Sequence, residues 1–433
     1  MAALMVGLAA GLAISAPAVA TPAGACTNAA DPGTMIRQTP WAQQLLAIDR
    51  LRPLSTGAGI TVAVIDSGVD AQHPQLAGRV LPGYDYLRNT PGGNFDCVSH
   101  GTAVASLIAA QHVDGIGFEG LAPGVTILPL RVSDHEDNDN NPKDAVSPQV
   151  FADAIRYAAD SGARIINISL TLDADFPAVA QAVRYAQEVK GCVVVASVGN
   201  HHTVTTGATP SVPGVSPSAV SDPPSYPAAY PNVLGVGAID EGGKRLDESQ
   251  VGPYVDLVAP GGNVLAATRV SGYGYWNGTS MAAPLVSAAA ALLWSTHPAM
   301  SNINVMWQLT HTADPMPGSN HGSEYGYGLV DPYRALSEQL PVAGSQSPAP
   351  IPAATVDPAA VARTADWHHH GQVALIVGGL AVLVAAGGAG FAVAVRRGRL
   401  RDWRPGNAAP PRIPPTVEEP ETVFFALPDR DLG

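Results

Sequence analysis

The chain has 433 residues, enough for one large domain with additional segments; 46% of them are hydrophobic and only 14% are charged. The formal net charge is −13, whereas nucleic-acid binding requires clustered Lys and Arg, so the composition excludes a nucleic-acid-binding protein. The low charge content is compatible with a globular core combined with membrane segments.

The N-terminal 20 residues are apolar, rich in small side chains, and end in Ala18-Val19-Ala20, a pattern typical of a cleavage site. We therefore predict a signal peptide over residues 1–20, followed by an N-terminal extension over residues 21–40. Because no Lys or Arg precedes Arg37, either the natural start lies further upstream or the signal is weak. An uncleaved anchor or a core helix is the alternative interpretation.

Residues 41–340 alternate short apolar runs with helical patterns and form the predicted catalytic domain. The runs are rich in Val and Ile without polar alternation, as in strands buried on both faces. Helix boundaries are visible at Ser147-Pro148 and Gly162, and again at Pro177 and Gly191. We expect an α/β fold with a mostly parallel central sheet flanked by helices. The expected strands are Ile60–Ile65, Val125–Val132, Ile165–Leu170, Val193–Val198 and Val233–Ile239.

Polar residues follow two of these strands directly. Asp66 follows the first strand, and Asn200 follows the fourth after one glycine. Functional side chains gather at the carboxyl ends of parallel strands, so the pattern predicts a site at that edge of the sheet.

Two loops in this region have unusual compositions. The segment 134–141 is acidic and rich in amides, which suits either a calcium site or a solvated surface loop. Its spacing is not that of an EF-hand, so we predict no metal. The segment His201–Pro224 is rich in Pro, Ser, Thr and Val and follows Asn200. It is expected to overhang the site, either as a passive insertion or as a loop that contacts substrate or a partner.

The C-terminal part has the pattern of a membrane anchor. Residues 341–372 are rich in Pro and Ala and read as a semi-extended linker. Residues 373–395 carry no charge and, as a helix, would span about 35 Å, enough to cross a bilayer. Five arginines lie between residues 396 and 404, which places the 396–433 tail in the cytoplasm and the catalytic domain outside. We therefore predict a single-pass protein of the cell membrane.

Three cysteines are present, and an exported domain meets oxidising conditions. One disulfide and one remaining thiol are expected. A Cys26–Cys97 bridge is the candidate pairing and would fasten the extension beside His100. Cys192 begins an apolar strand and is interpreted as a buried free thiol.

Three segments carry the groups needed for nucleophilic hydrolysis. They are Val62–Gly68, Ser99–Ala105 and Asn277–Pro284, and they supply Asp66, His100 and Ser280 in that order. A serine hydroxyl needs an adjacent base, and the base needs a group that orients it. With these motifs the chain resembles the subtilisin-like serine proteases over nearly the whole predicted catalytic domain. The resemblance implies that Ser280 is the nucleophile, His100 the general base and Asp66 its orienting carboxylate, without any cofactor.

The same resemblance implies further site residues. Asn200 matches the family's oxyanion asparagine, whose side-chain N–H stabilises the negative charge of the intermediate. Ser169, Leu170 and Thr171 match the extended segment that pairs with the substrate backbone, although the family usually has glycine in place of Thr171. Ser197-Val198, where alanines are common, imply a small or shallow pocket for the residue before the cleaved bond.

The arrangement of signal, protease domain, linker, membrane span and short Arg-led tail further resembles the mycosins, the membrane-anchored proteases of type VII secretion systems. The resemblance implies secreted proteins as substrates and a type VII secretion membrane complex as a possible partner. Two functions follow. One is an active endopeptidase; the other is a structural subunit of that complex whose proteolysis is dispensable. A serine esterase is a weaker alternative, because the nucleophile motif lacks the Gly-x-Ser-x-Gly pattern.

Overall fold

The structure is a computed structural model of the whole chain, in which two compact units, residues 1–347 and 348–433, are distinguished. The parts it describes are Pro22, 25–26, 32–135, 146–202, 221–317, 321–338, Leu340, Gly387 and 390–397. The predicted signal peptide, the linker and most of the tail lie outside these residues, as do most of the predicted membrane span and of the segments 134–141 and 201–224.

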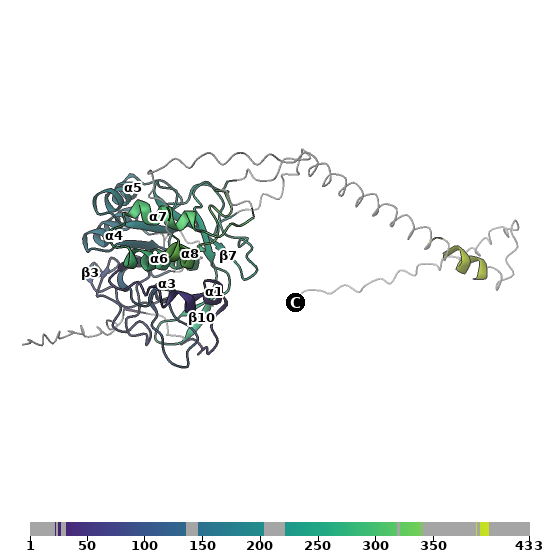
Figure 1. The fold of residues 1–433 in the computed structure, drawn as a ribbon, viewed down its shortest axis with the longest axis horizontal. Helices are drawn as coiled ribbons and strands as arrows, with labels where there is room; N and C mark the ends of the chain where they lie inside the picture. The colour runs from purple at the N-terminus through teal and green to yellow at the C-terminus, as the bar shows by residue number, and fades with distance from the viewer. Residues whose placement is uncertain are drawn as a thin grey trace, which may run out of the picture. The chain divides into compact units, whose positions relative to one another are not determined.

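A sheet forms the centre of the first unit, with helices packed around it (Figure 1). It has eight strands, in the order β3-β2-β4-β1-β5-β6-β7-β8. All neighbouring strands run parallel except β2 and β3, which form an antiparallel pair at one edge. The strands are β1 (Thr61–Asp66), β2 (Tyr84–Asp85), β3 (Thr90–Pro91), β4 (Thr126–Arg131), β5 (Ile165–Ile168), β6 (Val193–Ser197), β7 (Val233–Ile239) and β8 (Leu257–Pro260). A separate antiparallel hairpin consists of β9 (Val264–Ala267) and β10 (Tyr273–Trp276).

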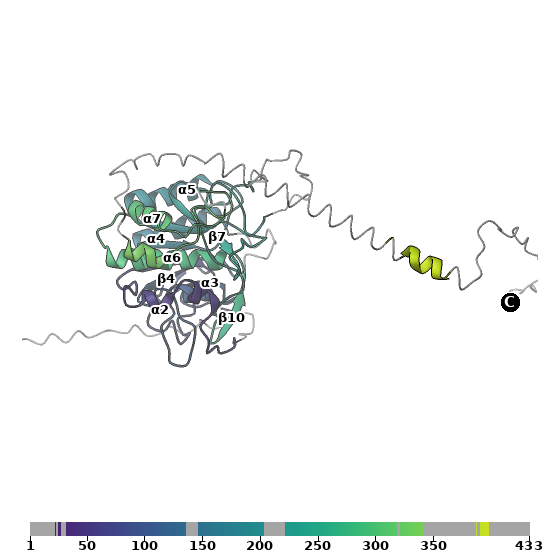
Figure 2. The same cartoon turned by 45° about the vertical axis from the view of Figure 1, so that its right-hand side comes forward.

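Helices cover both faces of the sheet, as Figure 2 shows for α4 and α5 on one side and α3 on the other. The helices are α1 (Trp41–Leu45), α2 (Ile48–Leu51), α3 (His100–Ala109), α4 (Pro148–Asp160), α5 (Pro177–Arg184), α6 (Thr279–Thr296), α7 (Asn302–His311) and α8 (Pro332–Ser337). A π-helical turn, η1 (Tyr185–Val189), continues α5.

Two buried apolar clusters, one on each face, explain the continuous Val and Ile runs of the strands. In β1, Val62 and Val64 pack in the cluster of α3 and α6, whereas Ala63 and Ile65 pack in the cluster of α4 and α5. Successive side chains of a strand point to opposite faces. In a strand that is covered on both sides, apolar residues are therefore favoured at every position. This confirms the predicted α/β class and the mostly parallel sheet.

Helix α6 is the centre of the first cluster and carries the Ser280 motif. It is 18 residues long and 89% of it is buried. Within the described parts of the chain it is the only helix long and apolar enough to cross a membrane. Burial against β5, β6, β7 and β8 accounts for its composition, since a helix that is apolar all round belongs in a core.

All five predicted strands are present, with ends that differ by up to two residues. The helix expected between Ser147-Pro148 and Gly162 is also confirmed, with Pro148 at its first position and Gly162 at φ +82°. The helix expected to run from Pro177 to Gly191 differs in its second half. The α-helix ends at Arg184, and the π-helical turn η1 follows it.

The N-terminal extension lies along the catalytic domain where it is described. Thr34 pairs antiparallel with Tyr273 of β10, through hydrogen bonds of 3.0 Å in both directions. Cys26 and Cys97 form a disulfide with a Cα–Cα distance of 5.2 Å. Cys192 is a buried free thiol, and burial raises its pKa to about 11. The pairing and the free thiol agree with the sequence-based expectation.

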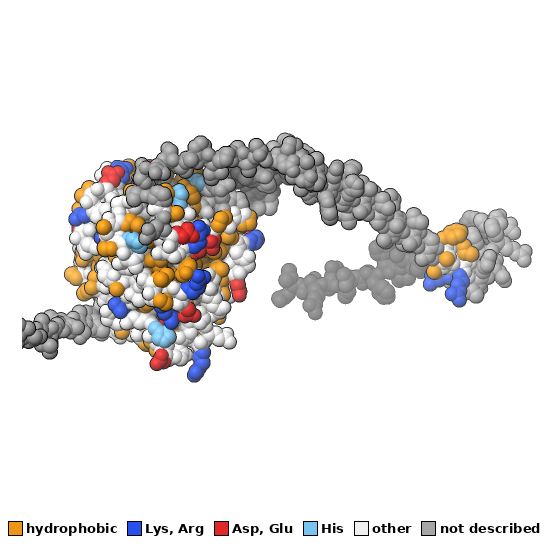
Figure 3. Space-filling view, in the orientation of Figure 1, with side chains coloured by type: hydrophobic (Ala, Val, Ile, Leu, Met, Phe, Trp, Pro, Cys, Tyr) orange, Lys and Arg blue, Asp and Glu red, His pale blue; other side chains and the backbone are white. Residues whose placement is uncertain are grey.

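In the second unit the structure describes a helix over residues 390–397. Its apolar side chains are exposed, with Phe391 73% and Val393 51% accessible. Basic side chains lie beside the hydrophobic ones on this helix (Figure 3), and its described part includes Arg396 and Arg397. Most of residues 373–395 lie outside the described parts, so the membrane span stays a prediction.

Candidate active site

The carboxyl edge of the sheet brings together segments that are far apart in the sequence. Asp66 is the last residue of β1, and Ser169 and Asn200 lie just beyond the ends of β5 and β6. His100 is the first residue of α3 and Ser280 the second residue of α6. Since β1, β5 and β6 are parallel neighbours, their carboxyl ends meet at one edge.

Asp66 and His100 form a buried hydrogen-bonded pair. The Nδ1 atom of His100 lies 2.7 Å from Oδ1 of Asp66, with His100 only 5% exposed and Asp66 inaccessible. The same Oδ1 accepts the backbone N–H of Ser67 at 2.7 Å. A carboxylate that accepts at Nδ1 keeps the proton there, which leaves Nε2 of the neutral imidazole as the basic atom.

Gly101 makes this pairing possible. A Cβ atom at Gly101 would lie 2.0 Å from the carbonyl oxygen of Gly68 and 3.1 Å from Oδ1 of Asp66. Any side chain there would push α3 away from the end of β1. The glycine after the histidine is therefore required by the close approach of these two elements.

Ser280 is tied to the end of β5 by two reciprocal hydrogen bonds. Its Oγ donates to the carbonyl oxygen of Ser169 at 3.0 Å, and Oγ of Ser169 donates to the carbonyl oxygen of Ser280 at 2.9 Å. Behind them, Nδ2 of Asn167 donates to Oγ of Ser169, and Oδ1 of Asn167 accepts from Ser287. Every member of this polar chain is buried.

Asn200 faces the start of α6. Its Oδ1 accepts the backbone N–H of Thr279 at 2.9 Å and the Thr279 hydroxyl at 3.0 Å. A backbone N–H can only donate, so Oδ1 must be the acceptor and the amide NH2 is directed elsewhere. Gly278, with φ +124°, lies next to that NH2 group, because a Cβ there would be 3.0 Å from Nδ2. The amide donor of Asn200 thus lies beside Gly278, two residues before Ser280.

The predicted substrate-binding segment lies at the same edge. Ser169 is inaccessible, Leu170 is 4% exposed and Thr171 is partly exposed. Beyond them, Leu172 already pairs with Tyr226 through backbone hydrogen bonds of 2.8 and 3.0 Å. The Ser169 side chain therefore contacts the interior, and the role of Ser169, Leu170 and Thr171 in binding substrate stays a prediction.

Several neighbours of the site could not be identified from the sequence. The ring of Trp276 meets that of His100 edge-on, with centroids 6.1 Å apart. The fold alone brings Asn167 into contact with Ser169, Ser287 with Asn167, and Asp96 with Ser67, the residue after Asp66. Of these residues, only Asp96 could have been noticed in the sequence, because it is a carboxylate four residues before His100.

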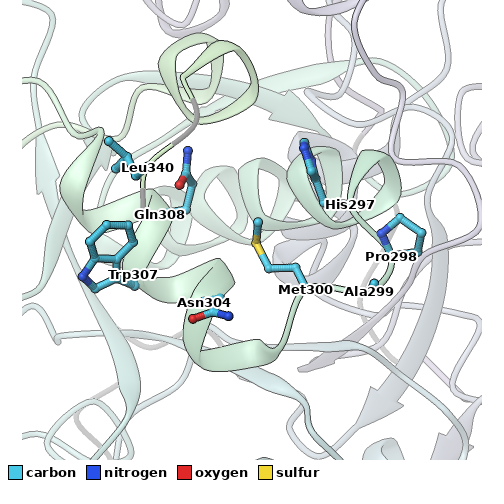
Figure 4. A pocket seen from close by; sticks show the side chains of 8 residues that line it. All are labelled: His297, Pro298, Ala299, Met300, Asn304, Trp307, Gln308 and Leu340. Atoms are coloured by element: carbon cyan, nitrogen blue, oxygen red, sulfur yellow. The ribbon is translucent and has the colours of Figure 1, made fainter. Parts of the chain in front are cut away.

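Away from these residues, a hollow lies between the C-terminal end of α6 and α7 (Figure 4). It is lined by His297, Pro298, Ala299, Met300, Asn304, Trp307, Gln308 and Leu340. His297 is 17 residues from Ser280 along the chain, which corresponds to about 25 Å of helix. This hollow is mainly apolar and does not share a residue with the Asp66–His100 pair.

Comparison with known proteins agrees with this geometry. Residues 57–328 match the subtilase family, peptidase S8. The thermophilic serine proteinase of Bacillus sp. AK1 is 38% identical over 280 residues, which cover 65% of this chain and 62% of that protein. Mycosin-1 of Mycolicibacterium smegmatis is 34% identical over 353 residues, covering 73% of this chain and 77% of the relative.

Solved structures show the same similarity. The crystal structure of MycP1 from Mycobacterium smegmatis has a TM-score of 0.61 and 31% identity, covering 74% of this chain and 92% of that one. A chain of the intact ESX-5 inner membrane complex has a TM-score of 0.60 and 30% identity, covering 85% and 94%. The chain belongs to the subtilase family of serine proteases. Among its relatives it is similar to the mycosins of type VII secretion systems.

Proposed function

We propose that this chain is a membrane-anchored serine endopeptidase that cleaves secreted proteins through Asp66, His100 and Ser280. The observation that carries the proposal is the buried 2.7 Å contact between His100 and Asp66 at the sheet edge, where Ser280 lies in the first turn of α6. This is the arrangement that a hydroxyl nucleophile, its base and the orienting group of that base require.

In the proposed first step, Nε2 of His100 removes the proton of Ser280 as its Oγ attacks the peptide carbonyl carbon. Asp66 keeps the other proton on Nδ1 and stabilises the imidazolium that forms. His100 then gives its proton to the leaving amine, and the peptide C–N bond breaks. Water attacks the resulting ester by the same route, which releases the acid and restores the Ser280 hydroxyl.

The negative charge on the carbonyl oxygen needs donors that are in place before the reaction. We assign this role to the amide NH2 of Asn200, and the assignment is supported by the two hydrogen bonds that its Oδ1 accepts from Thr279. One such donor typically accounts for about 3–4 kcal/mol of the activation barrier. The backbone of Ser169, Leu170 and Thr171 provides the edge along which an extended substrate would pair.

The membrane part of the proposal rests on residues 373–395 and the arginines after them. The exposed apolar helix at residues 390–397 supports it, as does the similarity to a chain of the ESX-5 inner membrane complex. We place the catalytic domain outside the cell membrane and associate it with a type VII secretion complex. A purely structural subunit is not favoured, because such a role would not require the Asp66–His100 and Ser169–Ser280 contacts.

Cleavage of a quenched fluorescent peptide library by the full-length protein in detergent tests the proposal. Wild-type protein should cleave, whereas Ser280→Ala and His100→Ala should each lower kcat by about 10⁶-fold and Asp66→Asn by about 10⁴-fold. Equal activity of wild-type protein and Ser280→Ala would contradict the assignment of the nucleophile. Folding of each variant is checked by its melting temperature.

A further inference from the structure

Asp96 is a buried carboxylate beside the site that the proposed mechanism does not use. It is 4% exposed and lies four residues before His100. Both of its oxygens accept hydrogen bonds from surrounding donors. Oδ1 accepts from Ser67 Oγ, Val98 N and Ser99 N, each at 3.0 Å, and Oδ2 accepts from Thr102 N at 2.9 Å and Thr102 Oγ1 at 2.7 Å.

The donors around Asp96 require a carboxylate. Each of its oxygens accepts at least one backbone N–H, and a backbone N–H cannot act as an acceptor. An amide in this position would direct its NH2 group against one of these donors. Burial raises the pKa of Asp96, while the hydrogen bonds from Thr102 and Val98 oppose that shift. The donor set therefore stabilises a negative charge that burial alone would disfavour.

Asp96 also connects the two elements that carry the Asp66–His100 pair. Ser67, which donates to Asp96, follows Asp66 at the end of β1. The Oγ of Ser67 in turn accepts the N–H of Gly101, the residue after His100, at 2.9 Å. One continuous set of hydrogen bonds thus runs from the end of β1 through Asp96 to the first turn of α3.

We infer that Asp96 is a positioning residue for the Asp66–His100 pair, holding the imidazole in place and adding a second negative charge at the N-terminus of α3. The inference rests on the proposed peptidase function. The N-terminus of a helix carries a partial positive charge, which disfavours an imidazolium in its first turn. A buried carboxylate at that terminus offsets this effect when His100 becomes protonated during catalysis.

The test compares Asp96→Asn with wild-type protein, using the rate of fluorophosphonate labelling of the full-length chain as a function of pH. At high pH the rate should fall by about tenfold, because the imidazole is less well aligned. The acid limb of the profile should move to lower pH, because the imidazolium loses a nearby negative charge. Asp66 itself and the charged residues that contact the neighbours of Asp96 remain in the variant. Asp70 contacts Thr102, Arg131 contacts Cys97, and Arg269 contacts Ser99.

Two further variants separate the roles of Asp96. In Ser67→Ala the charge of Asp96 remains, but two hydrogen bonds of Ser67 Oγ are lost, the one it donates to Asp96 and the one it accepts from Gly101 N–H. The rate should therefore fall by about threefold with the acid limb unmoved. Asp331→Asn is the matched control, since Asp331 likewise accepts a backbone N–H at the start of a helix, α8. It should label at the wild-type rate.

The outcomes distinguish the inference from the proposed function. If wild-type protein labels and Asp96→Asn matches it in rate and acid limb, the inference is wrong while the proposed function stands. A slower Asp96→Asn variant with an unmoved acid limb would also contradict the inference, because a merely structural role predicts that result. If Asp96→Asn does not fold, a wild-type rate in Ser67→Ala overturns the inference. Absence of labelling in folded wild-type protein contradicts both.

Discussion

Ser169 and Ser280 each donate a hydroxyl hydrogen bond to the carbonyl oxygen of the other, over 2.9 and 3.0 Å. The two residues are 111 positions apart in the sequence, one after β5 and one in the first turn of α6. Because Asn167 and Ser287 continue the chain of hydrogen bonds, the start of α6 is fixed to the sheet edge. The proposed nucleophile is therefore positioned by β5 as well as by its own helix.

Asn167→Ala should destabilise the domain and slow the reaction. The substitution removes the partner of both Ser169 and Ser287 in a buried location, which typically costs about 1–3 kcal/mol. We expect a melting temperature lower by several degrees and a reduced labelling rate at Ser280. Ser287→Ala removes only the hydrogen bond to Asn167, at the end of the network away from Ser280, and should lower stability by only about 1 kcal/mol. Equal effects of the two variants in thermal denaturation would contradict a network directed at Ser280.

Asn200 offers a substitution that separates its two roles. In Asn200→Asp the carboxylate still accepts from Thr279 but no longer donates, so kcat should fall by about 10²–10³-fold while stability is nearly unchanged. Asn200→Leu should lose both the donor and the contact with Thr279. Steady-state kinetics with one peptide and a thermal melt of each variant distinguish these results. A wild-type kcat in Asn200→Asp would remove Asn200 from the oxyanion site.

The fold class and the position of Asp66 could be predicted from local patterns, whereas His100 and Ser280 were identified by motifs that resemble those of the subtilisin-like proteases. Buried parallel strands leave continuous runs of Val and Ile, and a residue at the end of such a run is placed at the sheet edge by the topology. The short strands β2 and β3 left no such pattern, because each has two residues.

The contacts that complete the site were not predictable in the same way. Asn167 lies in the run Ile165–Ile168 and has no local feature that distinguishes it from other polar residues in strands. Its partner Ser287 is 120 positions away, so only the packing of α6 on β5 brings them together. The donors around Asp96 are likewise defined by the approach of α3 to the end of β1.

The disulfide should contribute to stability. It joins residues 71 positions apart, and a disulfide typically contributes about 2–4 kcal/mol of stability. We expect the double variant Cys26→Ser, Cys97→Ser to melt several degrees below wild-type protein. A reductant should lower the melting temperature of wild-type protein but not of the double variant. Cys192→Ala, at the buried free thiol, should respond to the reductant as wild-type protein does.

Asp256 should make stability depend on pH in mildly acidic solution. Burial raises its pKa to about 6, above the ordinary value of about 3.9 in the unfolded chain. The folded state therefore binds more protons than the unfolded state between pH 4 and 6, and its stability falls as pH rises through that range. A shift of about two units corresponds to at most about 3 kcal/mol.

Asp256→Asn should remove this pH dependence, because an amide does not titrate, and the variant should gain stability relative to wild-type protein as pH rises from about 4 to about 6. Urea unfolding across this range measures the difference. Asp49→Asn, at a side chain that is 84% exposed, controls for the loss of a carboxylate in general. Parallel stability curves for wild-type protein and Asp256→Asn would contradict the raised pKa.

Truncation after Leu340 tests the membrane anchor. If residues 373–395 span the membrane, the full-length chain should remain in the membrane fraction after alkaline carbonate extraction, whereas the truncated chain should be released. Extraction of the full-length chain by carbonate would contradict the span.

Substitution of the arginines at residues 396–404 should leave the chain in the membrane but change its orientation, which protease protection measures.

The most direct measurement for the whole account is mass-spectrometric mapping of a fluorophosphonate adduct on the full-length protein. The account predicts one adduct on Ser280 in wild-type protein, a strongly reduced yield in His100→Ala, and none in Ser280→Ala. An adduct on another serine, or a folded wild-type protein that forms none, would contradict the assignment of Ser280 as a nucleophile activated by Asp66 and His100.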